Sequence, residues 1–507
     1  MERKWWTLVL SSIATFMLLL DITVVNVALP DIQRDLNASL SSLQWVVDAY
    51  SLMLAAFLLT AGSLGDRMGR RRVFSLGLGL FTVASFLCGI SGDPTLLNLA
   101  RGLQGIGGAA MFATSLALIG QEFHGKDRAM AFGVWGATVG GAVAVGPLVG
   151  GVITEHLGWE WIFFVNIPIG IVAVALTELR LANVAAQDPQ RIDLPGLVTF
   201  SSGLFLLIFG LIRGNPDGWG SATIVASLVG SVALLLAFLA IEARSSHPML
   251  DLALFRKPAF NGVSAVAFGL SAGMFAMFLY LTIYMQGVLD FSPLETGLRF
   301  LPLTVLSFLV APISGNLSNR IPIRVLLGVG LALVGVGLML MHGLRPDSDI
   351  SALLPGFLVA GIGIGITNPG IGQGAIAVVP PAKAGMGSGI NTTFRQVGIA
   401  TGVASLGAVF QGQVDSKLSE LLPNAPPGLA ETISSGGSRA AVTAAPPGQR
   451  TEIVHAAKVA FVSGFNDILL IGAIVCFIGA ALGLALVRSS DFISASQEAE
   501  TTEPVAA

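Results

Sequence analysis

The sequence predicts an all-α integral membrane protein with 14 transmembrane helices, and composition is the first observation that predicts it. Of its 507 residues, 53% are hydrophobic and only 11% are charged, whereas about 25% of residues are charged in a typical soluble protein. The mean hydropathy is +0.79, and apolar runs long enough to cross a bilayer recur from end to end. The net charge of -3 and the dispersed basic residues give no reason to expect a nucleic-acid partner.

Each expected span is an apolar run of about 20 residues, bounded by charge, Pro or clusters of Asn, Asp and Gly. The first run follows Arg3 and Lys4 as in a signal peptide, but no small-residue cleavage site follows and the run continues to Leu29. We therefore expect it to be retained as a helix. The expected spans cover residues 7–29, 44–65, 73–91, 95–120, 130–153, 161–179, 195–213, 221–241, 259–286, 297–318, 323–342, 352–378, 386–410 and 467–487.

The loops predict the orientation of the chain in the membrane. An even number of spans puts both termini on one side, and placing them in the cytoplasm puts most of the 27 Lys and Arg residues there as well, as the positive-inside rule requires. Residues 411–466, rich in Pro, Ala, Gly and Ser, then form an extracytoplasmic loop with room for one short helix. We expect the tail over residues 488–507 to be disordered.

Internal repetition predicts two related halves. Residues 62–72 resemble residues 315–324, and residues 130–133 resemble residues 386–389 at a nearly equal offset. Coincidence among Gly- and Leu-rich helices is the alternative explanation. A duplication predicts a six-helix bundle over residues 1–180, an inserted helix pair over 181–257 and a second six-helix bundle over 258–487.

Four motifs make the chain similar to a known family. LLLDITVVNVALPDI, at 18–32, and RGLQGIGGA, at 101–109, are similar to its motifs in helices 1 and 4. GSLGDRMGRRRV, at 62–73, is similar to its signature between helices 2 and 3, and GATVGGAVAVGPLVGG, at 136–151, to its antiporter motif in helix 5. The chain thereby resembles the major facilitator superfamily, and within it the fourteen-helix drug:proton antiporter family, over residues 7–487.

The resemblance implies a proton-coupled antiporter that exports small amphipathic molecules, such as drugs or antibiotics, across the bacterial cytoplasmic membrane. Its substrate binds near the midplane between the two repeats. The implied partners are a small-molecule substrate, protons and the lipid bilayer. No cofactor is implied, because the proton gradient drives transport, and we expect a monomer.

Three charged residues within the spans are the candidates for proton coupling. A charge near the bilayer centre costs about 3 kcal/mol on insertion scales, so it needs a reason to be there. Asp21 lies deep in the first span, where a carboxylate can take up a proton from bulk water; a structural pair with Arg101 is the alternative. Arg101 keeps its proton and would hold a neighbouring acid deprotonated. Asp48 lies nearer the outer interface, where solvation also fits a structural role.

The loop between helices 2 and 3 is the second candidate site. Its arginines can be explained by topology alone. The resemblance adds a conformational latch. In it, Asp66 accepts hydrogen bonds from a helix N-terminus in the other half of the protein and pairs with an arginine. These contacts would favour the conformation in which the cytoplasmic side is closed. The latch residues are Gly62, Asp66, Arg67, Gly69, Arg70 and Arg71.

Glycines at spacings near four in the fifth span predict close helix packing. Packing alone is one interpretation, and a hinge or seal bent at a proline is the other. The motif residues are Gly136, Gly140, Gly146, Pro147, Gly150 and Gly151.

Polar and aromatic residues within the spans are candidates for the substrate cavity. Polar side chains need an inward-facing position, whereas aromatic ones more often pack or face lipid. Some family members carry an acidic residue where this chain has Arg395, so the resemblance does not imply a preference for cationic drugs. The candidates are Asn26, Tyr280, Tyr284, Asn368, Asn391 and Arg395.

Other classes of function fit less well. The five histidines lie in loops or at helix ends without the spacing of metal ligands or a catalytic base, and no nucleotide-binding motif is present, so we expect neither an enzyme nor a metal site. Two alternatives stay open in the same fold. One is an exporter of lipids or lipid-linked metabolites, and the other is a proton-coupled importer, against which the helix 5 motif is the main argument.

Overall fold

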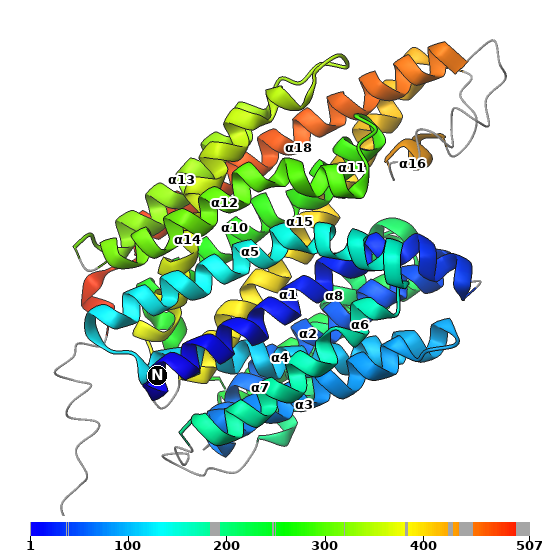
Figure 1. Ribbon diagram of the computed structural model, residues 1–507. Helices are drawn as coiled ribbons and strands as arrows, with labels where there is room; N and C mark the ends of the chain where they lie inside the picture. Colours follow the sequence, from blue (N-terminus) through cyan, green and yellow to red (C-terminus); the bar gives the residue numbers. More distant parts are fainter. Residues whose placement is uncertain are drawn as a thin grey trace, which may run out of the picture.

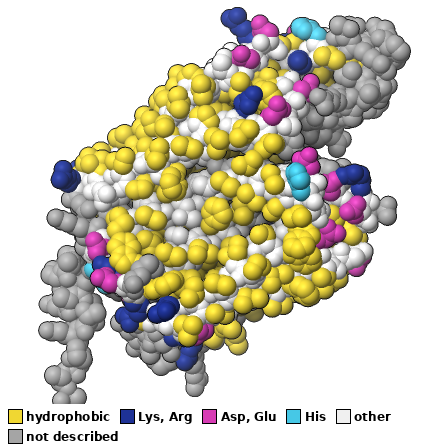
Figure 2. Space-filling view, in the orientation of Figure 1, with side chains coloured by type: hydrophobic (Ala, Val, Ile, Leu, Met, Phe, Trp, Pro, Cys, Tyr) yellow, Lys and Arg dark blue, Asp and Glu magenta, His cyan; other side chains and the backbone are white. Residues whose placement is uncertain are grey.

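The fold is a set of long helices that lie roughly side by side (Figure 1). No strand occurs in the residues that the structure describes. In the space-filling view, hydrophobic side chains cover the middle of the molecule, and charged side chains gather toward its two ends (Figure 2). The computed structural model describes residues 2–36, 38, 40–182, 193–245, 248, 250–318, 320–380, 384–423, 429–434 and 450–492.

The helices of the first six expected spans are called the first bundle here. Local signals fix several of its helix ends: Asp93 precedes α4 and accepts hydrogen bonds from the backbone N–H groups of Thr95 and Leu96, as an N-cap residue should. Gly69 separates α2 from α3 with φ of 97°, a conformation that favours glycine. The helices are α1 (Arg3–Asp35), α2 (Leu40–Met68), α3 (Arg70–Gly89), α4 (Pro94–Glu122), α5 (Gly125–Leu157), α6 (Trp161–Phe164) and α7 (Asn166–Arg180).

The inserted pair consists of α8 (Leu194–Asp217) and α9 (Ala222–Glu242). α8 packs against α2 of the first bundle, where the hydroxyls of Thr60 and Ser201 lie 3.0 Å apart. It also contacts α15 of the second bundle, because Asn215 donates a hydrogen bond of 3.0 Å to the carbonyl of Ala404. α8 therefore lies against both bundles.

The helices of the remaining spans are called the second bundle. One of them is interrupted by a π-helical turn, η2, between α10 and α11. The elements are η1 (Leu252–Arg256), α10 (Pro258–Leu270), η2 (Ser271–Phe275), α11 (Met277–Gly287), α12 (Pro293–Leu317), α13 (Ile323–Met341), η3 (Ile350–Ala352), α14 (Leu354–Ala377), α15 (Ala384–Leu421), α16 (Leu429–Ser434), α18 (Arg450–Leu486) and η5 (Ser489–Asp491).

The expected all-α membrane fold is confirmed. In the described residues, 13 helical segments are long and apolar enough to cross a membrane. The 33-residue helix α5 occupies the position of the remaining expected span. The number of spans therefore agrees approximately with the 14 expected.

The region over 411–466 differs from the loop expected there. α15 continues to Leu421, α16 provides the short helix, and α18 already begins at Arg450. Lys417 and Glu420 form an i,i+3 ion pair of 2.7 Å on the extension of α15, and such pairs support helix in polar sequence. A hydropathy criterion places the ends of a helix at the edge of the apolar run, so it misses this extension. The tail beyond residue 492 lies outside the described residues.

Backbone contacts join the two bundles toward one end of the molecule. A Cβ on Gly389 of α15 would lie 3.0 Å from the carbonyl oxygen of Leu58 in α2, and a Cβ on Gly133 of α5 would lie 2.9 Å from the Cα of Pro312 in α12. In Figure 1, α5 accordingly runs between the two groups of helices. Close approaches of this kind require glycine.

Candidate functional site

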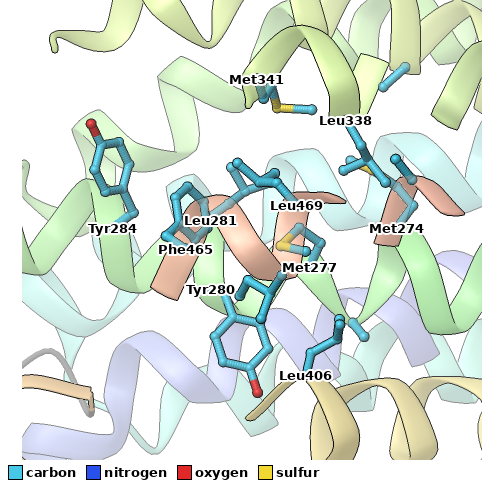
Figure 3. Packing of buried hydrophobic residues seen from close by; sticks show 14 of the residues in the cluster. Met274, Met277, Tyr280, Leu281, Tyr284, Leu338, Met341, Leu406, Phe465 and Leu469 are labelled. Carbon is cyan, nitrogen blue, oxygen red and sulfur yellow. The ribbon is translucent and has the colours of Figure 1, made fainter. Parts of the chain in front are cut away.

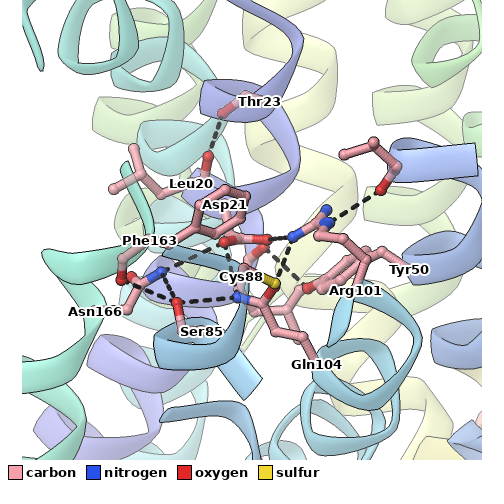
Figure 4. Close-up of polar contacts among 12 residues, drawn as sticks. Leu20, Asp21, Thr23, Tyr50, Ser85, Cys88, Arg101, Gln104, Phe163 and Asn166 are labelled. Carbon is pink, nitrogen blue, oxygen red and sulfur yellow. Dashed lines mark hydrogen bonds and ion pairs between the residues drawn. The ribbon is translucent and has the colours of Figure 1, made fainter. Parts of the chain in front are cut away.

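The ion pair between Asp21 of α1 and Arg101 of α4 lies at the centre of the first bundle (Figure 4). Each side chain is 1% exposed. The guanidinium also donates hydrogen bonds of 3.0 Å to the carbonyl of Val46 and 2.7 Å to the side-chain oxygen of Gln104. The structure therefore brings together two of the three expected proton-coupling residues.

Amides from two further positions hold the same carboxylate. Gln104 donates to Asp21 at 2.9 Å, and Asn166 of α7 donates to it at 3.3 Å. Ser85 of α3 lies between the two amides and accepts from both. Asp21 thus accepts hydrogen bonds from three different side chains.

Sequence reasoning missed Gln104, Ser85 and Asn166. The available signal was their polarity inside apolar spans, because a polar side chain at that depth needs a partner. Asp48, in contrast, lies half-buried in α2, and none of the hydrogen bonds described for this network involves it. The positive charge of Arg213 in α8 acts on it instead.

The Asp66 carboxylate connects the two bundles. One of its oxygens accepts hydrogen bonds of 3.1 and 3.0 Å from Arg70. The other accepts a hydrogen bond of 2.8 Å from the backbone N–H of Met386, in the first turn of α15, which begins at Ala384. Gly62 lies one turn earlier in α2 and is buried. These contacts have the form that the family resemblance implies for the latch.

The other latch residues contact different parts of the chain. Arg67 donates a hydrogen bond of 3.3 Å to the carbonyl of Pro248, in the segment between the inserted pair and the second bundle. Arg71 forms an ion pair with Glu178 of α7, within the first bundle. Gly69 supplies the turn between α2 and α3. Of the contacts named here, the one between Asp66 and Met386 joins the two bundles.

Helix α5 packs against α1 through part of its motif. A Cβ on Gly146 would overlap the Thr23 side chain, and a Cβ on Gly150 would lie 3.2 Å from the backbone of Val24. Gly151 differs, because no atom from another helix in the described part of the chain lies within 4 Å of the position of its Cβ. Close packing is therefore required at two of these three glycines.

The N-terminal end of the glycine motif in α5 faces the second bundle. A Cβ on Gly136 would lie 3.4 Å from Pro369 of α14, and one on Gly140 would lie 3.3 Å from the Ser307 hydroxyl of α12. α5 consequently touches both halves of the protein. Pro147 lies within the helix, but its side chain is outside the described residues.

Tyr280 and Tyr284 of α11 lie in the packed core of the second bundle (Figure 3). Tyr280 donates a hydrogen bond of 2.7 Å to the carbonyl of Val403. Tyr284 stacks on Phe465 with ring centroids 5.1 Å apart, and its hydroxyl lies 3.5 Å from the carbonyl of Ser348. The two rings point in different directions, so their placement gives no support to a shared substrate cavity.

The polar cavity candidates are buried with few partners. Asn368 of α14 is 1% exposed, and neither of its side-chain polar atoms has a hydrogen-bond partner in the described part of the chain. Asn391 of α15 is 2% exposed, and its amide nitrogen also has no such partner. Arg395 lies 5.6 Å from the ring centre of Phe275. The side chain of Asn26 lies outside the described residues.

Among the described residues, no three His, Cys, Asp or Glu side chains are grouped so that they can hold a metal ion. The buried polar groups are instead dispersed over the helices of both bundles.

Known proteins resemble the chain in sequence over most of its length. It is 33% identical over 501 residues to the tetracenomycin C resistance and export protein of Streptomyces glaucescens, covering 95% of this chain and 91% of that protein. It is 38% identical over 424 residues to the puromycin resistance protein pur8 of Streptomyces alboniger, covering 82% and 84%. It is 35% identical over 479 residues to the multidrug resistance protein Stp of Mycobacterium tuberculosis, covering 92% and 88%.

The fold and the family agree with these relatives. The human organic anion transporter MFSD10 (TETRAN) superposes with a TM-score of 0.60 over 93% of this chain and 99% of its own, at 14% identity, which shows the shared fold alone. Residues 11–403 match the Major Facilitator Superfamily. The chain therefore belongs to the major facilitator superfamily, as a multi-pass membrane transporter related to bacterial antibiotic and multidrug resistance exporters.

Proposed function

We propose that the chain is a proton-coupled antiporter that exports small amphipathic molecules from a bacterial cell. Resistance or export of antibiotics is what the names of the relatives describe. The observation that carries the proton-coupled part is Asp21, a fully buried carboxylate in contact with a buried arginine and two amide donors.

The chemistry of this group fits proton exchange. Arg101 cannot give up its proton under physiological conditions, so Asp21 is the group of the ion pair that titrates. In the described form, the arginine and the two amides hold the carboxylate. Movement of α1 relative to α4 during transport weakens these contacts and allows the carboxylate to take up a proton. The pair thus links the charge of Asp21 to the arrangement of the helices.

The arrangement of the bundles fits alternating access. Asp66 joins α2 to α15 at one end. At the other end of the first bundle, the apolar cluster around Val24, Ile32 and Trp159 contains residues of that bundle alone. We assign the end that carries Asp66, together with both termini, to the cytoplasm. The described form is then closed toward the cytoplasm.

The test is transport in inverted membrane vesicles, whose lumen corresponds to the cell exterior. Three amphipathic dyes cover the charge classes: cationic ethidium, anionic pyrenebutyrate and neutral Nile red. We expect at least one dye to accumulate when an acid lumen is imposed, and to leave when nigericin collapses the gradient. Vesicles without the protein give the background.

The alternatives predict other results in the same vesicles. A proton-coupled importer would deplete the lumen of dye when the lumen is acid. A lipid exporter would leave all three dyes at background and would instead move a fluorescent phospholipid between leaflets. Either result would contradict the proposed function.

A further inference from the structure

Two arginines are buried within the spans, and their surroundings differ. Arg101 contacts the Asp21 carboxylate, a backbone carbonyl and the oxygen of Gln104. Arg395 of α15 is 9% exposed, and the described residues provide it with no carboxylate within ion-pair distance and no hydrogen-bond acceptor. Its one described contact is the ring of Phe275. A buried cation left in this way is costly unless an anion joins it.

The helix face that carries Arg395 is polar. Ser388, Asn391 and Arg395 occupy positions i, i+3 and i+7 of α15, so they fall on one face of the helix. The Ser388 hydroxyl and the Asn391 amide nitrogen are both buried without a partner in the part of the chain that the structure describes. This stripe of three residues therefore carries hydrogen-bond donors that have no acceptor among the described residues.

Beyond the stripe, α15 packs on α10 and on the π-helical turn η2. A Cβ on Gly398 would lie 2.8 Å from the carbonyl oxygen of Phe268, and one on Gly402 would lie 2.8 Å from the Cα of Ala272, so the two backbones touch. Phe275, the ring beside Arg395, is the last residue of the turn. The hydroxyl of Ser271, its first residue, is also buried and unsatisfied in the described region. Turns of this kind are rare and occur frequently at functional sites.

Helix α14 adds two more polar side chains and contacts both α10 and α15. Asn368 has neither amide atom paired, and the amide nitrogen of Gln373 has no partner among the described residues. Gln373 is 8% exposed. The unsatisfied groups of α14, α15 and η2 are thus mainly N–H and O–H donors, and a buried donor without an acceptor is unfavourable.

We propose that Arg395 binds the negatively charged group of the transported molecule, with Asn391 as an additional donor, so that this chain prefers amphipathic molecules that carry an acidic group. A guanidinium matches a carboxylate in both charge and geometry, and the contact is stronger away from water. The ring of Phe275 covers one side of the guanidinium, so the N–H groups at its edge are left for the ligand. This inference rests on the proposed export function, because it specifies the substrate class of that transporter.

The test measures binding to the purified full chain in phosphatidylcholine nanodiscs, with empty nanodiscs as the background for membrane partition. Three ligands share one aromatic body: pyrenebutyrate, its neutral methyl ester and the cationic pyrenebutyl-trimethylammonium. We expect the wild-type protein to bind the carboxylate about tenfold or more tightly than either analogue, as a charge-assisted hydrogen bond predicts. Equal binding of the three ligands, or tighter binding of the cation, would overturn the proposal.

Two variants test whether Arg395 causes the preference for the carboxylate ligand. Arg395→Gln should weaken pyrenebutyrate about tenfold while changing the binding of the methyl ester less than twofold, and Arg395→Lys should retain most of the preference because it keeps the charge. An unchanged preference in Arg395→Gln would overturn the assignment to this residue. If that variant does not fold, the comparison of the three ligands on the wild-type protein still decides the substrate class.

An anionic lipid headgroup is the other source of the same chemistry. Nanodiscs that contain phosphatidylglycerol should leave the binding of pyrenebutyrate nearly unchanged if the site takes a transported acid. Loss of binding in them would identify a lipid phosphate as the ligand and overturn the substrate assignment. Proton-driven export of ethidium without any preference for the acid would reject this inference while leaving the proposed function intact.

Discussion

Asp21 and Arg101 show how a charged pair is stable within an apolar bundle. The carboxylate accepts from the guanidinium, Gln104 and Asn166, while the guanidinium also reaches the carbonyl of Val46 and lies 4.3 Å from the ring centre of Tyr50. Each charge is therefore satisfied by several groups rather than by its partner alone. Removing one charge should then cost more than removing both.

A double-mutant comparison tests this dependence. Arg101→Gln leaves the Asp21 anion buried without its cation and should lower the stability of the protein by about 3–5 kcal/mol. Asp21→Asn combined with Arg101→Gln should recover a large part of the loss, because both charges are gone. Thermal unfolding in detergent and the amount of inserted protein provide the measurement. Equal losses in the single and double variants would show that the two residues do not act as a pair.

Sequence reasoning identified the charged residues of the site but not their partners. Asp21 and Arg101 stand out because formal charge is rare in an apolar span. Ser85 and Asn166 are neutral, and many neutral polar residues in spans bond only to their own helix, as Thr138 does to the carbonyl of Val134. Their role depends on which helices are neighbours, and that is a property of the fold.

Helix α5 contacts α1 of its own bundle and α12 and α14 of the other, through glycines at different heights. Gly136 contacts α14 and Gly140 contacts α12, whereas Gly146 and Gly150 contact α1. A side chain introduced at a glycine that contacts a neighbouring helix must displace either that helix or α5 itself. We therefore expect the glycine positions of this motif to differ in how well they tolerate substitution by a larger residue.

The substitution Gly146→Leu tests the packing of α5 on α1. Its Cβ would overlap the Thr23 side chain, so we expect α5 to be displaced and proton-driven dye accumulation to fall to background or to leak. Gly151→Leu is the matched control, because no atom from another helix in the described part of the chain lies within 4 Å of the Cβ position there, and it should transport normally. The measurement is dye accumulation per amount of inserted protein, and tight, normal transport by Gly146→Leu would show that the packing is incidental.

Hydropathy predicted the existence of the elements better than their ends or interruptions. The expected span over 259–286 corresponds to α10, η2 and α11, but the π-helical turn leaves no mark in the apolar pattern. Such a turn depends on contacts such as those of Gly398 and Gly402 with α10 and η2. The extension of α15 was missed because it lies in polar sequence, where the apolar criterion has no signal.

At the scale of the whole molecule, the contact between Asp66 and the start of α15 bears on the balance between conformations. It joins α2 of one bundle to the N-terminus of a helix in the other through a hydrogen bond of 2.8 Å. Negative charge is stabilised at a helix N-terminus by the backbone N–H groups and the helix dipole. The contact therefore favours the form in which this end is closed.

The substitution Asp66→Asn tests the latch. It keeps the shape of the side chain but removes its charge, which weakens the contact by about 1.5–3 kcal/mol if it is fully lost. We expect the variant to insert normally and to shift toward the form that is open at this end. Distances between spin labels on α2 and α15, measured by pulsed electron paramagnetic resonance, should lengthen.

The control is Arg72→Gln, which removes a charge from an exposed arginine of the same loop and should leave the distances as in the wild type. Lost transport in Asp66→Asn with an unchanged distance distribution would reject the latch.

The account as a whole depends on Asp21 coupling proton entry to substrate exit. The most direct measurement compares two modes of transport in proteoliposomes that contain equal amounts of wild-type or Asp21→Asn protein, using a dye that the wild type accumulates. One mode is exchange of dye across the membrane without a pH gradient, and the other is accumulation driven by an imposed gradient. We predict that Asp21→Asn, which keeps hydrogen bonding but cannot titrate, still exchanges dye and no longer accumulates it. Gradient-driven accumulation at the wild-type level in Asp21→Asn would contradict the account.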